Sequence, residues 1–159
     1  MSGELDIVDI LEAELARLLE WSRAADQRIR FTTPLSTAML GTLGILGANL
    51  SSWSNFQALT SVAAAFPLAL SVAFSAFATF PRTTRPDGSL IYFGGISSLG
   101  LKRCEEAILS LSREAYTQDL ISQCHRNAQI VCVKYRWIQR SLFCLFVSAV
   151  PWSVSLFIL

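Results

Sequence analysis

A stretch of 51 residues without a charged side chain constrains this chain more than any other feature. Residues 31–81 contain no Lys, Arg, Asp, Glu or His, and a second uncharged run, residues 141–159, closes the sequence. All 13 basic and all 12 acidic residues lie in residues 1–30 and 82–140. The hydrocarbon core of a bilayer takes about 20 apolar residues per helical pass. The sequence therefore predicts an all-α membrane protein with three transmembrane helices.

The uncharged block divides at residues 49–55, which are mostly polar and small. We therefore expect two spans in residues 31–81, at about 33–50 and 56–80, and a third span at 141–159. Small side chains dominate the first two spans, and such residues let membrane helices approach closely. They include Gly41, Gly44 and Gly47 at steps of three.

Residues 1–30 are expected to form a helix outside the membrane. Acidic residues crowd its start and arginines its end, which stabilises a helix through its dipole. Apolar or small residues recur in alternating steps of three and four, the heptad pattern of a helix packed against another helix. An amphipathic surface helix would show the same spacing. The positions are Val8, Leu11, Leu15, Leu18, Ser22, Ala25 and Ile29.

Residues 82–140 are expected to hold a turn-rich loop and one long helix that starts near Ser97. The apolar seam of this helix breaks near residues 116–119, resumes, and runs directly into the third span. This helix and residues 1–30 would then form a helical bundle outside the membrane. The first part of the seam comprises Leu101, Cys104, Ile108, Leu111 and Ala115; the second comprises Ile121, Cys124, Ala128, Val131, Tyr135, Ile138 and Leu142.

The distribution of positive charge predicts the orientation in the membrane. The loop between the first two spans carries no Lys or Arg, whereas the other two segments outside the membrane carry all of them. By the positive-inside rule, residues 1–30 and 82–140 face the cytosol and Leu159 lies at or beyond the far face. The seams are weakly apolar and the spans are rich in Gly and Ala, which favours a homo-oligomer.

Residues arranged for catalysis do not stand out in the sequence. His125 has no obvious partner, and Glu105 and Glu106 resemble a solvated helix face more than an acid–base pair. The four cysteines fit neither a metal site nor a disulfide framework, and there is no phosphate-binding or dinucleotide motif. We therefore expect no enzyme activity, no metal, no cofactor and no nucleic-acid partner.

Charged residues gather immediately before two of the spans. The group before the first span is Asp26, Arg28 and Arg30. The group before the third span is Lys134, Arg136 and Arg140. Both groups would lie at the cytosolic membrane surface, so Asp26 and Lys134 are expected to form a structural ion pair between two packed helices. Contacts between the cations and lipid headgroups would explain the same residues.

A glycine-rich segment precedes the expected start of the long helix. Phe93 is followed by two glycines and then by Ile96 and Ser97. Free backbone N–H groups at a helix start can hold an anion such as a phosphate. An ordinary serine cap would account for the same residues.

The order of several short motifs resembles the small transmembrane effectors of Pycsar anti-phage systems. The motifs are Trp21-x4-Asp26-x-Arg28, Leu90-Ile-Tyr-Phe-Gly94, Asp119-Leu-x2-Gln123 and Lys134-Tyr135-Arg136. They extend over most of the chain in the order in which the family has them. The family usually has a lysine where this chain has Arg28, so the charge is kept. Residues 102–104 depart from the acidic and aromatic pair of some members.

The resemblance implies an effector of antiviral defence in the bacterial inner membrane. A partner pyrimidine cyclase would make cyclic CMP or cyclic UMP during infection, and the effector would sense it through the long helix and impair the membrane. Two alternatives remain: a membrane effector triggered by another signal, and a membrane scaffold that recruits partners through its cytosolic helices.

If the ligand is a cyclic pyrimidine nucleotide, the chain offers candidate partners for its phosphate and its base. The phosphate suits the helix start near Ser97 and the cations nearby. The flat base suits stacking on an aromatic ring. The cationic candidates are Arg28, Lys134 and Arg136, and the stacking candidates are Trp21, Tyr92, Phe93 and Tyr135.

Overall fold

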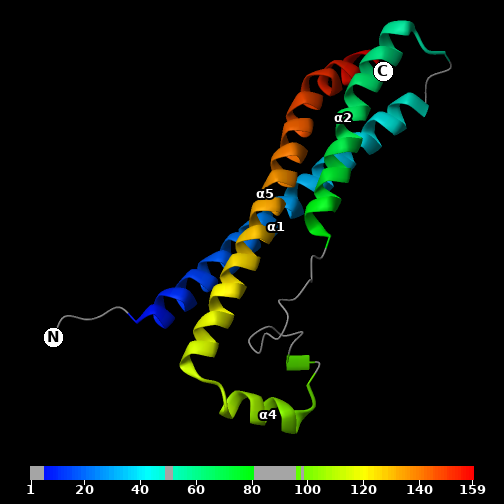
Figure 1. Cartoon of the computed structure of the whole chain (residues 1–159). Coiled ribbons are helices and arrows are strands. Elements are labelled where there is room, and N and C mark those ends of the chain that lie inside the picture. Colours follow the sequence, from blue (N-terminus) through cyan, green and yellow to red (C-terminus); the bar gives the residue numbers. More distant parts are fainter. Residues whose placement is uncertain (1–5, 49–51, 81–95, 98) are drawn as a thin grey trace. The chain divides into compact units, whose positions relative to one another are not determined.

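The regular secondary structure of the chain is helical throughout the part that is described. The computed structural model describes residues 6–48, 52–80, 96–97 and 99–159. Its main elements are α1 (Ile7–Ala48), α2 (Asn55–Thr79), α4 (Leu101–Leu109) and α5 (Arg113–Ile158) (Figure 1). Within these residues there is no strand, which confirms the predicted all-α fold.

Three of these helices are long and apolar enough to cross a membrane, as the sequence predicts: α1, α2 and α5. Helix α1 has 42 residues and α5 has 46, about twice the length that one crossing needs. Each therefore combines a charged segment and an apolar span in one uninterrupted helix. Pro34, Pro67 and Pro151 lie inside these helices without ending them.

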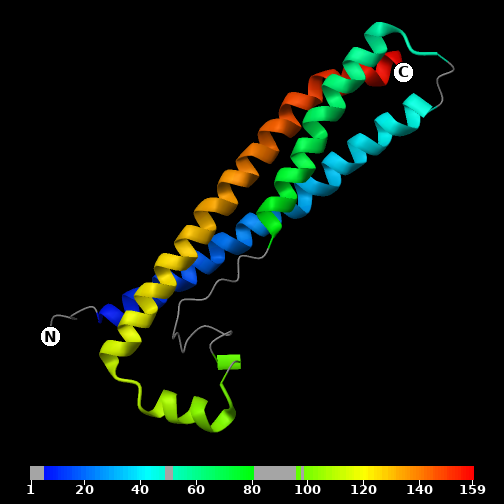
Figure 2. The same ribbon diagram turned by 45° about the vertical axis from the view of Figure 1, so that its right-hand side comes forward.

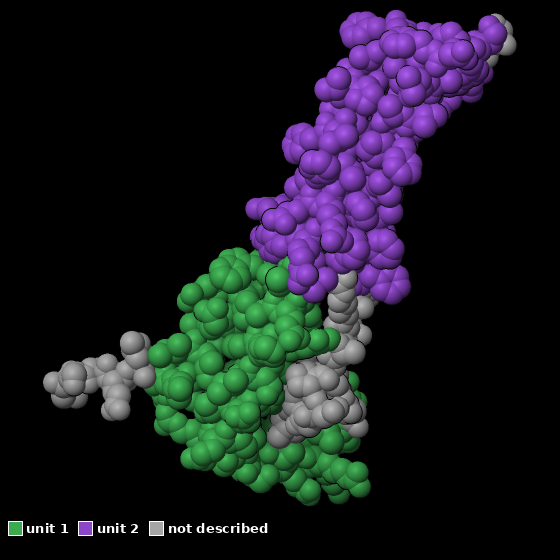
Figure 3. All heavy atoms as spheres, turned by 45° about the horizontal axis from the view of Figure 1, so that its top comes forward, with its two compact units in different colours: residues 1–23, 81–132 green, residues 24–80, 133–159 purple. Residues whose placement is uncertain are grey.

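The chain forms two compact units, coloured separately in Figure 3. Unit 1 comprises residues 1–23 and 81–132, and unit 2 comprises residues 24–80 and 133–159. Helices α1 and α5 contribute residues to both units. Unit 2 therefore contains all of α2 and the apolar halves of α1 and α5.

The seam predicted for the N-terminal helix is confirmed, and it continues far beyond that helix. Each of its seven positions is buried or half-buried. The same alternation of three and four then runs on through the span. The further buried positions on α1 are Thr32, Ser36, Met39 and Leu43, and the corresponding positions on α2 are Ser61, Ala64, Leu68, Ser71, Ser75 and Ala78. A repeat of 3.5 residues keeps each seam facing its neighbours along the whole helix.

The seam predicted for the first part of α5 is wrong by one residue. Ile121 is 43% exposed and Ala128 is exposed, whereas Leu120 and Gln123 are buried. The packed face carries polar residues at Gln123 and Asn127, which apolar spacing alone does not mark. From Val131 onward the buried positions fall on the heptad again.

The prediction of one long helix from Ser97 is also wrong, because the chain turns between α4 and α5. Ser112 caps the start of α5: its hydroxyl accepts a hydrogen bond from the backbone N–H of Ala115 at 3.2 Å. The break thus lies at residues 110–112 and not at 116–119. Helix α4 buries no residue, and Leu101 is 85% exposed, so the first part of the predicted seam is not a packed face.

The core of unit 2 has apolar ends and a hydroxyl-rich middle. One apolar cluster contains Ala25, Ile29, Ala78 and Ile138, and the other contains Met39, Leu43, Ala64, Leu68 and Leu145. The three helices that enclose them run side by side in Figures 1 and 2.

Four serines link all three helices of unit 2. Ser36 Oγ on α1 lies 2.9 Å from Ser71 Oγ on α2. Ser141 Oγ on α5 lies 3.0 Å from Ser71 Oγ and 2.8 Å from Ser75 Oγ, and it donates to the Ser71 carbonyl. Small hydroxyl side chains permit close approach and satisfy each other inside a bilayer.

Direct hydrogen bonds also join the helices at the end of unit 2 where the chain terminates. The Gln57 amide at the start of α2 donates to the Ile158 carbonyl at 2.6 Å. The same side chain closes a capping box with Ser54. The Trp152 indole N–H donates to the Met39 carbonyl at 3.1 Å. These bonds fix this end of α5 to both α1 and α2.

The three span glycines differ in their roles. A Cβ at Gly47 would lie 2.7 Å from the Trp53 ring, so this glycine makes room for the ring. A Cβ at Gly41 or Gly44 would meet nothing within 4 Å. Gly41 and Gly44 therefore face outward and do not contribute to the close contacts between the helices of unit 2.

Candidate functional site

An ion pair joins α1 and α5 where they enter the apolar part of unit 2. Lys134 Nζ donates to Asp26 Oδ1 at 2.8 Å and to Asp26 Oδ2 at 3.0 Å. The Lys134 side chain is 15% exposed and that of Asp26 is 44% exposed. The two residues paired above on sequence grounds are therefore in contact.

A cation–ring contact lies on the same two helices. The Arg28 guanidinium lies 5.4 Å from the centroid of the Tyr135 ring. Tyr135 is half-buried and packs against the cluster of Ala25, Ile29, Ala78 and Ile138. Asp26, Arg28, Lys134 and Tyr135 thus form one group, here called the juxtamembrane cluster.

Aromatic residues extend this region one turn further along α5. The Trp137 ring centroid lies 5.6 Å from that of Phe74 and 5.3 Å from that of Phe77, which joins α5 to α2. The Arg140 guanidinium lies 4.7 Å from the Trp137 ring centroid. Sequence reasoning missed Trp137; the signal was its spacing of three from Arg140, which puts both on one helix face.

The structure brings together only some of the predicted ligand-binding residues. Arg28, Lys134 and Tyr135 belong to the juxtamembrane cluster, and Arg136 is exposed on the next position of α5. Trp21, which is 47% exposed, and the exposed Ser97 belong to unit 1. The candidates Tyr92 and Phe93 lie outside the described residues.

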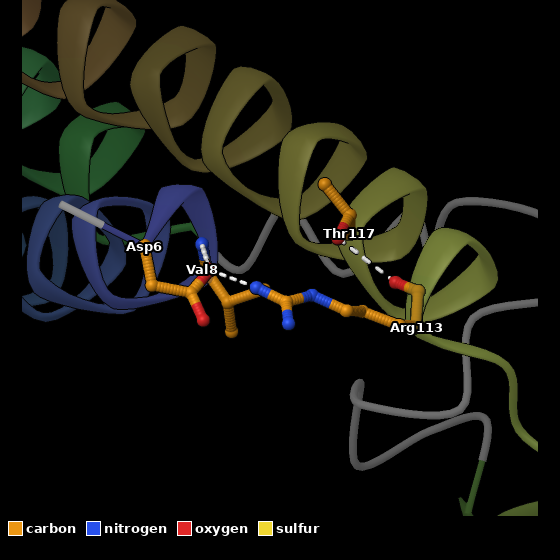
Figure 4. Close-up of polar contacts among 4 residues, drawn as sticks. All are labelled: Asp6, Val8, Arg113 and Thr117. Carbon is orange, nitrogen blue, oxygen red and sulfur yellow. Dashed lines mark hydrogen bonds and ion pairs between the residues drawn. The ribbon is translucent and has the colours of Figure 1, made fainter. Parts of the chain in front are cut away.

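Unit 1 has its own set of polar contacts between α1 and α5 (Figure 4). Asp6 Oδ1 accepts a hydrogen bond from the Val8 backbone N–H at 3.1 Å and also contacts the Arg113 guanidinium. Both interactions, the backbone bond first, lower the pKa of the Asp6 carboxyl. Tyr116 donates to Glu12 at 2.6 Å, and this bond raises the pKa of the phenol.

A cysteine thiol makes a further contact between α1 and α5 in unit 1. Cys124 Sγ lies 3.5 Å from the Leu11 carbonyl oxygen. Burial, and then the nearby Glu14, raise the pKa of this thiol, so it stays protonated and weakly nucleophilic near neutral pH.

The described residues bring charged and aromatic side chains together in the juxtamembrane cluster. Among them no cluster of three His, Cys, Asp or Glu is placed to hold a metal ion. The juxtamembrane cluster offers two cations and an aromatic ring beside an apolar core. Such a group suits a flat anionic ligand.

The fold and this cluster define a class: a multi-pass helical membrane protein whose spans continue into charged helical segments. The model of the Pycsar effector protein domain matches residues 10–159 of the chain. The chain belongs to this family, and it is therefore an effector, rather than the cyclase, of a Pycsar anti-phage defence system. Comparison with curated proteins and with solved structures gave no significant match.

Proposed function

We propose that this effector senses a cyclic pyrimidine mononucleotide, cyclic UMP or cyclic CMP, made by a partner cyclase during phage infection. On binding it, the protein impairs the bacterial inner membrane and stops the infected cell. Membership of the Pycsar effector family supports this proposal.

The observation that carries the proposal is the position of the Asp26–Lys134 ion pair. It lies on the two helices that continue without interruption from unit 1 into the spans of unit 2. A ligand that changes this pair therefore acts on helices that also cross the membrane. No additional connecting element is needed.

The nucleotide would compete for the partners within the juxtamembrane cluster. A cyclic mononucleotide carries one negative charge on its phosphate, which can replace the Asp26 carboxylate beside Lys134. Its base can replace the Arg28 guanidinium on the Tyr135 ring, and Arg28 and Arg136 supply further positive charge. Trp21, Tyr92, Phe93 and Ser97 remain further candidates for contacts with the nucleotide.

The resting and active states would differ in whether Asp26 holds Lys134. A ligand shifts an equilibrium only by its difference in affinity for the two states. The nucleotide would bind Lys134 better once Asp26 has released it, and would thereby favour separation of α1 from α5. Hydrogen bonds between membrane helices contribute about 0.6 kcal/mol each on average, so the serine contacts would oppose this separation only modestly.

The protein would lie in the inner membrane with residues 1–30 and 82–140 in the cytosol. The confinement of all Lys and Arg to these segments supports this orientation. The nucleotide is produced in the cytosol, so the juxtamembrane cluster would face the compartment that contains the signal.

Several copies would act together as a homo-oligomer. A groove of about 470 Å³ lies between α1 and α2, with Gly44 and Ser61 among its lining residues. Gly44 leaves backbone open, and Ser61 Oγ is buried without a hydrogen-bond partner among the described residues. A helix of a second copy, approaching closely at Gly44, would supply that partner.

Dye-loaded liposomes that carry the purified protein test the proposal. We expect leakage on addition of cyclic UMP or cyclic CMP, and little on addition of cyclic AMP or non-cyclic UMP. Lys134→Gln should raise the nucleotide concentration needed by roughly tenfold or more, because one charged hydrogen bond to the phosphate is lost. Tyr135→Ala should also raise it, because the stacking surface for the base is lost. Asp26→Asn should lower the nucleotide concentration needed, because the neutral amide competes less well than the carboxylate for Lys134.

Arg30→Gln is the matched control, because it removes an exposed cation near the cluster. It should leave the nucleotide concentration nearly unchanged. Leakage that ignores every cyclic mononucleotide would reject nucleotide sensing. If Asp26→Asn and Lys134→Gln shifted the response in the same direction, competition for Lys134 would be wrong even if sensing is right.

A further inference from the structure

A groove on the outer face of unit 2 runs from charged to apolar side chains. It has a volume of about 500 Å³ and lies beside α5, with one wall from α2. Arg136, Gln139 and Arg140 line its polar end, and Phe74, Phe143 and Cys144 line its apolar part. This volume is in the range of small-molecule binding sites.

Ring contacts hold the walls of this groove in place. Phe74 packs on Trp137, and the Arg140 guanidinium lies over the same indole ring at 4.7 Å. A guanidinium stacked on an aromatic ring keeps its N–H donors directed outward and loses less freedom on binding an anion. The polar end is thus prepared for an anionic partner before one arrives.

The change from charge to apolarity matches the depth profile of a bilayer leaflet. Arg140 is the last charged residue before the uncharged run that ends the chain. Arg136 and Phe143 are seven residues apart on one helix, about 10 Å at 1.5 Å per residue. The headgroup layer of one leaflet is about 5–8 Å thick, so cations and phenylalanine would bracket its boundary with the hydrocarbon.

We propose that this groove binds one anionic phospholipid. The phosphate of the headgroup pairs with Arg140 and Arg136, Gln139 hydrogen-bonds the headgroup, and an acyl chain lies against Phe74, Phe143 and Cys144. Phe143 is 69% exposed, so the lipid covers an apolar surface that the chain itself leaves open. Charge complementarity along the groove selects a lipid with a net negative charge over a zwitterionic one.

This site shares Arg136 with the candidate nucleotide contacts but contains neither Asp26 nor Lys134, and the lipid proposal does not depend on nucleotide sensing. Arg140 and Phe143 are not among the candidate nucleotide contacts, and the Arg140 guanidinium lies over the Trp137 ring. Their substitution can therefore test lipid binding while the response to cyclic nucleotides is measured independently.

Native mass spectrometry of the full-length protein with phosphatidylglycerol or phosphatidylcholine tests the proposal. We expect one phosphatidylglycerol to be retained per chain and to be bound at least tenfold more tightly than phosphatidylcholine. One cation near an anionic membrane surface strengthens binding by about fivefold even without a specific site. Arg140→Gln should weaken phosphatidylglycerol binding by more than this factor. Phe143→Ser should weaken the binding of both lipids.

Arg30→Gln is the matched control, because it also removes one exposed positive charge near the membrane. An equal loss for Arg30→Gln and Arg140→Gln would show general attraction to an anionic surface and would overturn the site. Inorganic phosphate that competes as well as phosphatidylglycerol does would overturn the lipid assignment. If Arg140→Gln fails to fold, Arg140→Lys replaces it. This variant keeps the charge but lacks the planar guanidinium stacked on Trp137, so it should reduce selectivity for phosphatidylglycerol.

Discussion

Lys134 has little contact with water, and its charge is balanced chiefly by a half-exposed carboxylate. Removing one member of such a pair leaves the other charge without its partner, which costs more than the pair itself contributes. We therefore expect the pair to contribute more to specifying how α1 meets α5 than to net stability. Under the proposed mechanism the two helices would therefore separate at a small net cost once another anion pairs with Lys134.

A double-mutant cycle measures the strength of this pair. We expect Asp26→Asn and Lys134→Gln each to destabilise the protein, with a coupling energy of about 1–3 kcal/mol, between the values of exposed and fully buried pairs. Thermal unfolding in one detergent gives the change in stability of each single variant and of the double variant relative to wild type. Additive effects of the two substitutions would mean that the pair does not form in the membrane protein.

The Asp6 carboxylate predicts a dependence of stability on pH. Its pKa is lower in the folded protein than in an unfolded chain, so the unfolded chain binds more protons in the acid range. The stabilisation is complete above the unfolded pKa near 3.9 and is lost as the pH falls through the lowered folded pKa. Asp6→Asn should therefore lower the melting temperature at pH 7 and have almost no effect near pH 2.

The matched control for Asp6 is Asp9, an exposed carboxylate on the next turn of α1. Asp9→Asn should change the melting temperature less than Asp6→Asn at pH 7. A difference between wild type and Asp6→Asn that stays constant from pH 2 to pH 7 would contradict a role of the ionised carboxylate.

Single residues of the cluster were predictable where charge and depth in the membrane constrain them. Asp26 and Lys134 could be paired from sequence because both precede a span on the same side. The contacts of Trp137 with Phe74 and Phe77 could not be predicted. The two phenylalanines belong to a third helix, α2, whose rotation about its axis is set by packing. Aromatic spacing alone gives no information about that rotation.

At the scale of elements, the serine contacts divide the spans into two apolar layers. Ser141 is almost fully buried, at 1% exposure, and contacts α2 through two hydroxyls and a carbonyl. A larger side chain at this position has no room, since Ser71 and Ser75 lie within hydrogen-bond distance. The three helices are therefore held at a separation that only small residues permit.

Substitution of Ser141 tests this packing. Ser141→Leu should destabilise the protein by about 1–3 kcal/mol or more through overpacking and lost hydrogen bonds. Ser141→Ala should cost about 1 kcal/mol, since it loses the bonds and keeps the size. Ser153→Leu, at an exposed position of the same helix, should change the unfolding temperature little. Tolerance of leucine at Ser141 would contradict the close approach.

The heptad spacing predicted the packed face of α1 but not that of the start of α5. On α1 the seam positions outside the membrane are mostly apolar, so hydropathy marks them. On α5 the buried Gln123 replaces an apolar residue, and Ile121 is exposed beside it. Likewise the turn before α5 depends on the Ser112 cap, a local hydrogen bond that competes with a continuous apolar pattern.

For the whole molecule, the orientation in the membrane gives a direct prediction. Alkaline phosphatase, which is active only outside the cytosol, should be active when fused after Leu159 and inactive when fused after Ser110. The reason is the confinement of all Lys and Arg to residues 1–30 and 82–140. Activity of the Ser110 fusion, or inactivity of a stably expressed Leu159 fusion, would contradict the three-span orientation.

Self-association is a second prediction at this scale. Gly44→Leu fills the groove beside Ser61 and should shift the protein from larger species towards the monomer in mass photometry. Gly47→Leu is unsuitable as a control, because Trp53 occupies its space. Ala48→Leu, at an exposed position of the same helix, should leave the distribution unchanged. A wild-type protein that is monomeric with and without cyclic nucleotide would reject the homo-oligomer.

The two ends of unit 2 differ in the interactions that hold α5. One end has the hydrogen bonds from Gln57 to Ile158 and from Trp152 to Met39. At the end where the chain terminates, α5 is tied to α1 and α2 by hydrogen bonds between neutral groups, where an anion finds no opposite charge. At the other end, one of its ties to α1 is the Asp26–Lys134 charge pair, in which the proposed anionic ligand would replace the carboxylate. Release of that pair would therefore change the crossing angle of the helices about a fixed pivot instead of sliding them lengthwise. The bilayer leaflet beside the ion pair would be deformed first, while the opposite leaflet would still face a closed bundle.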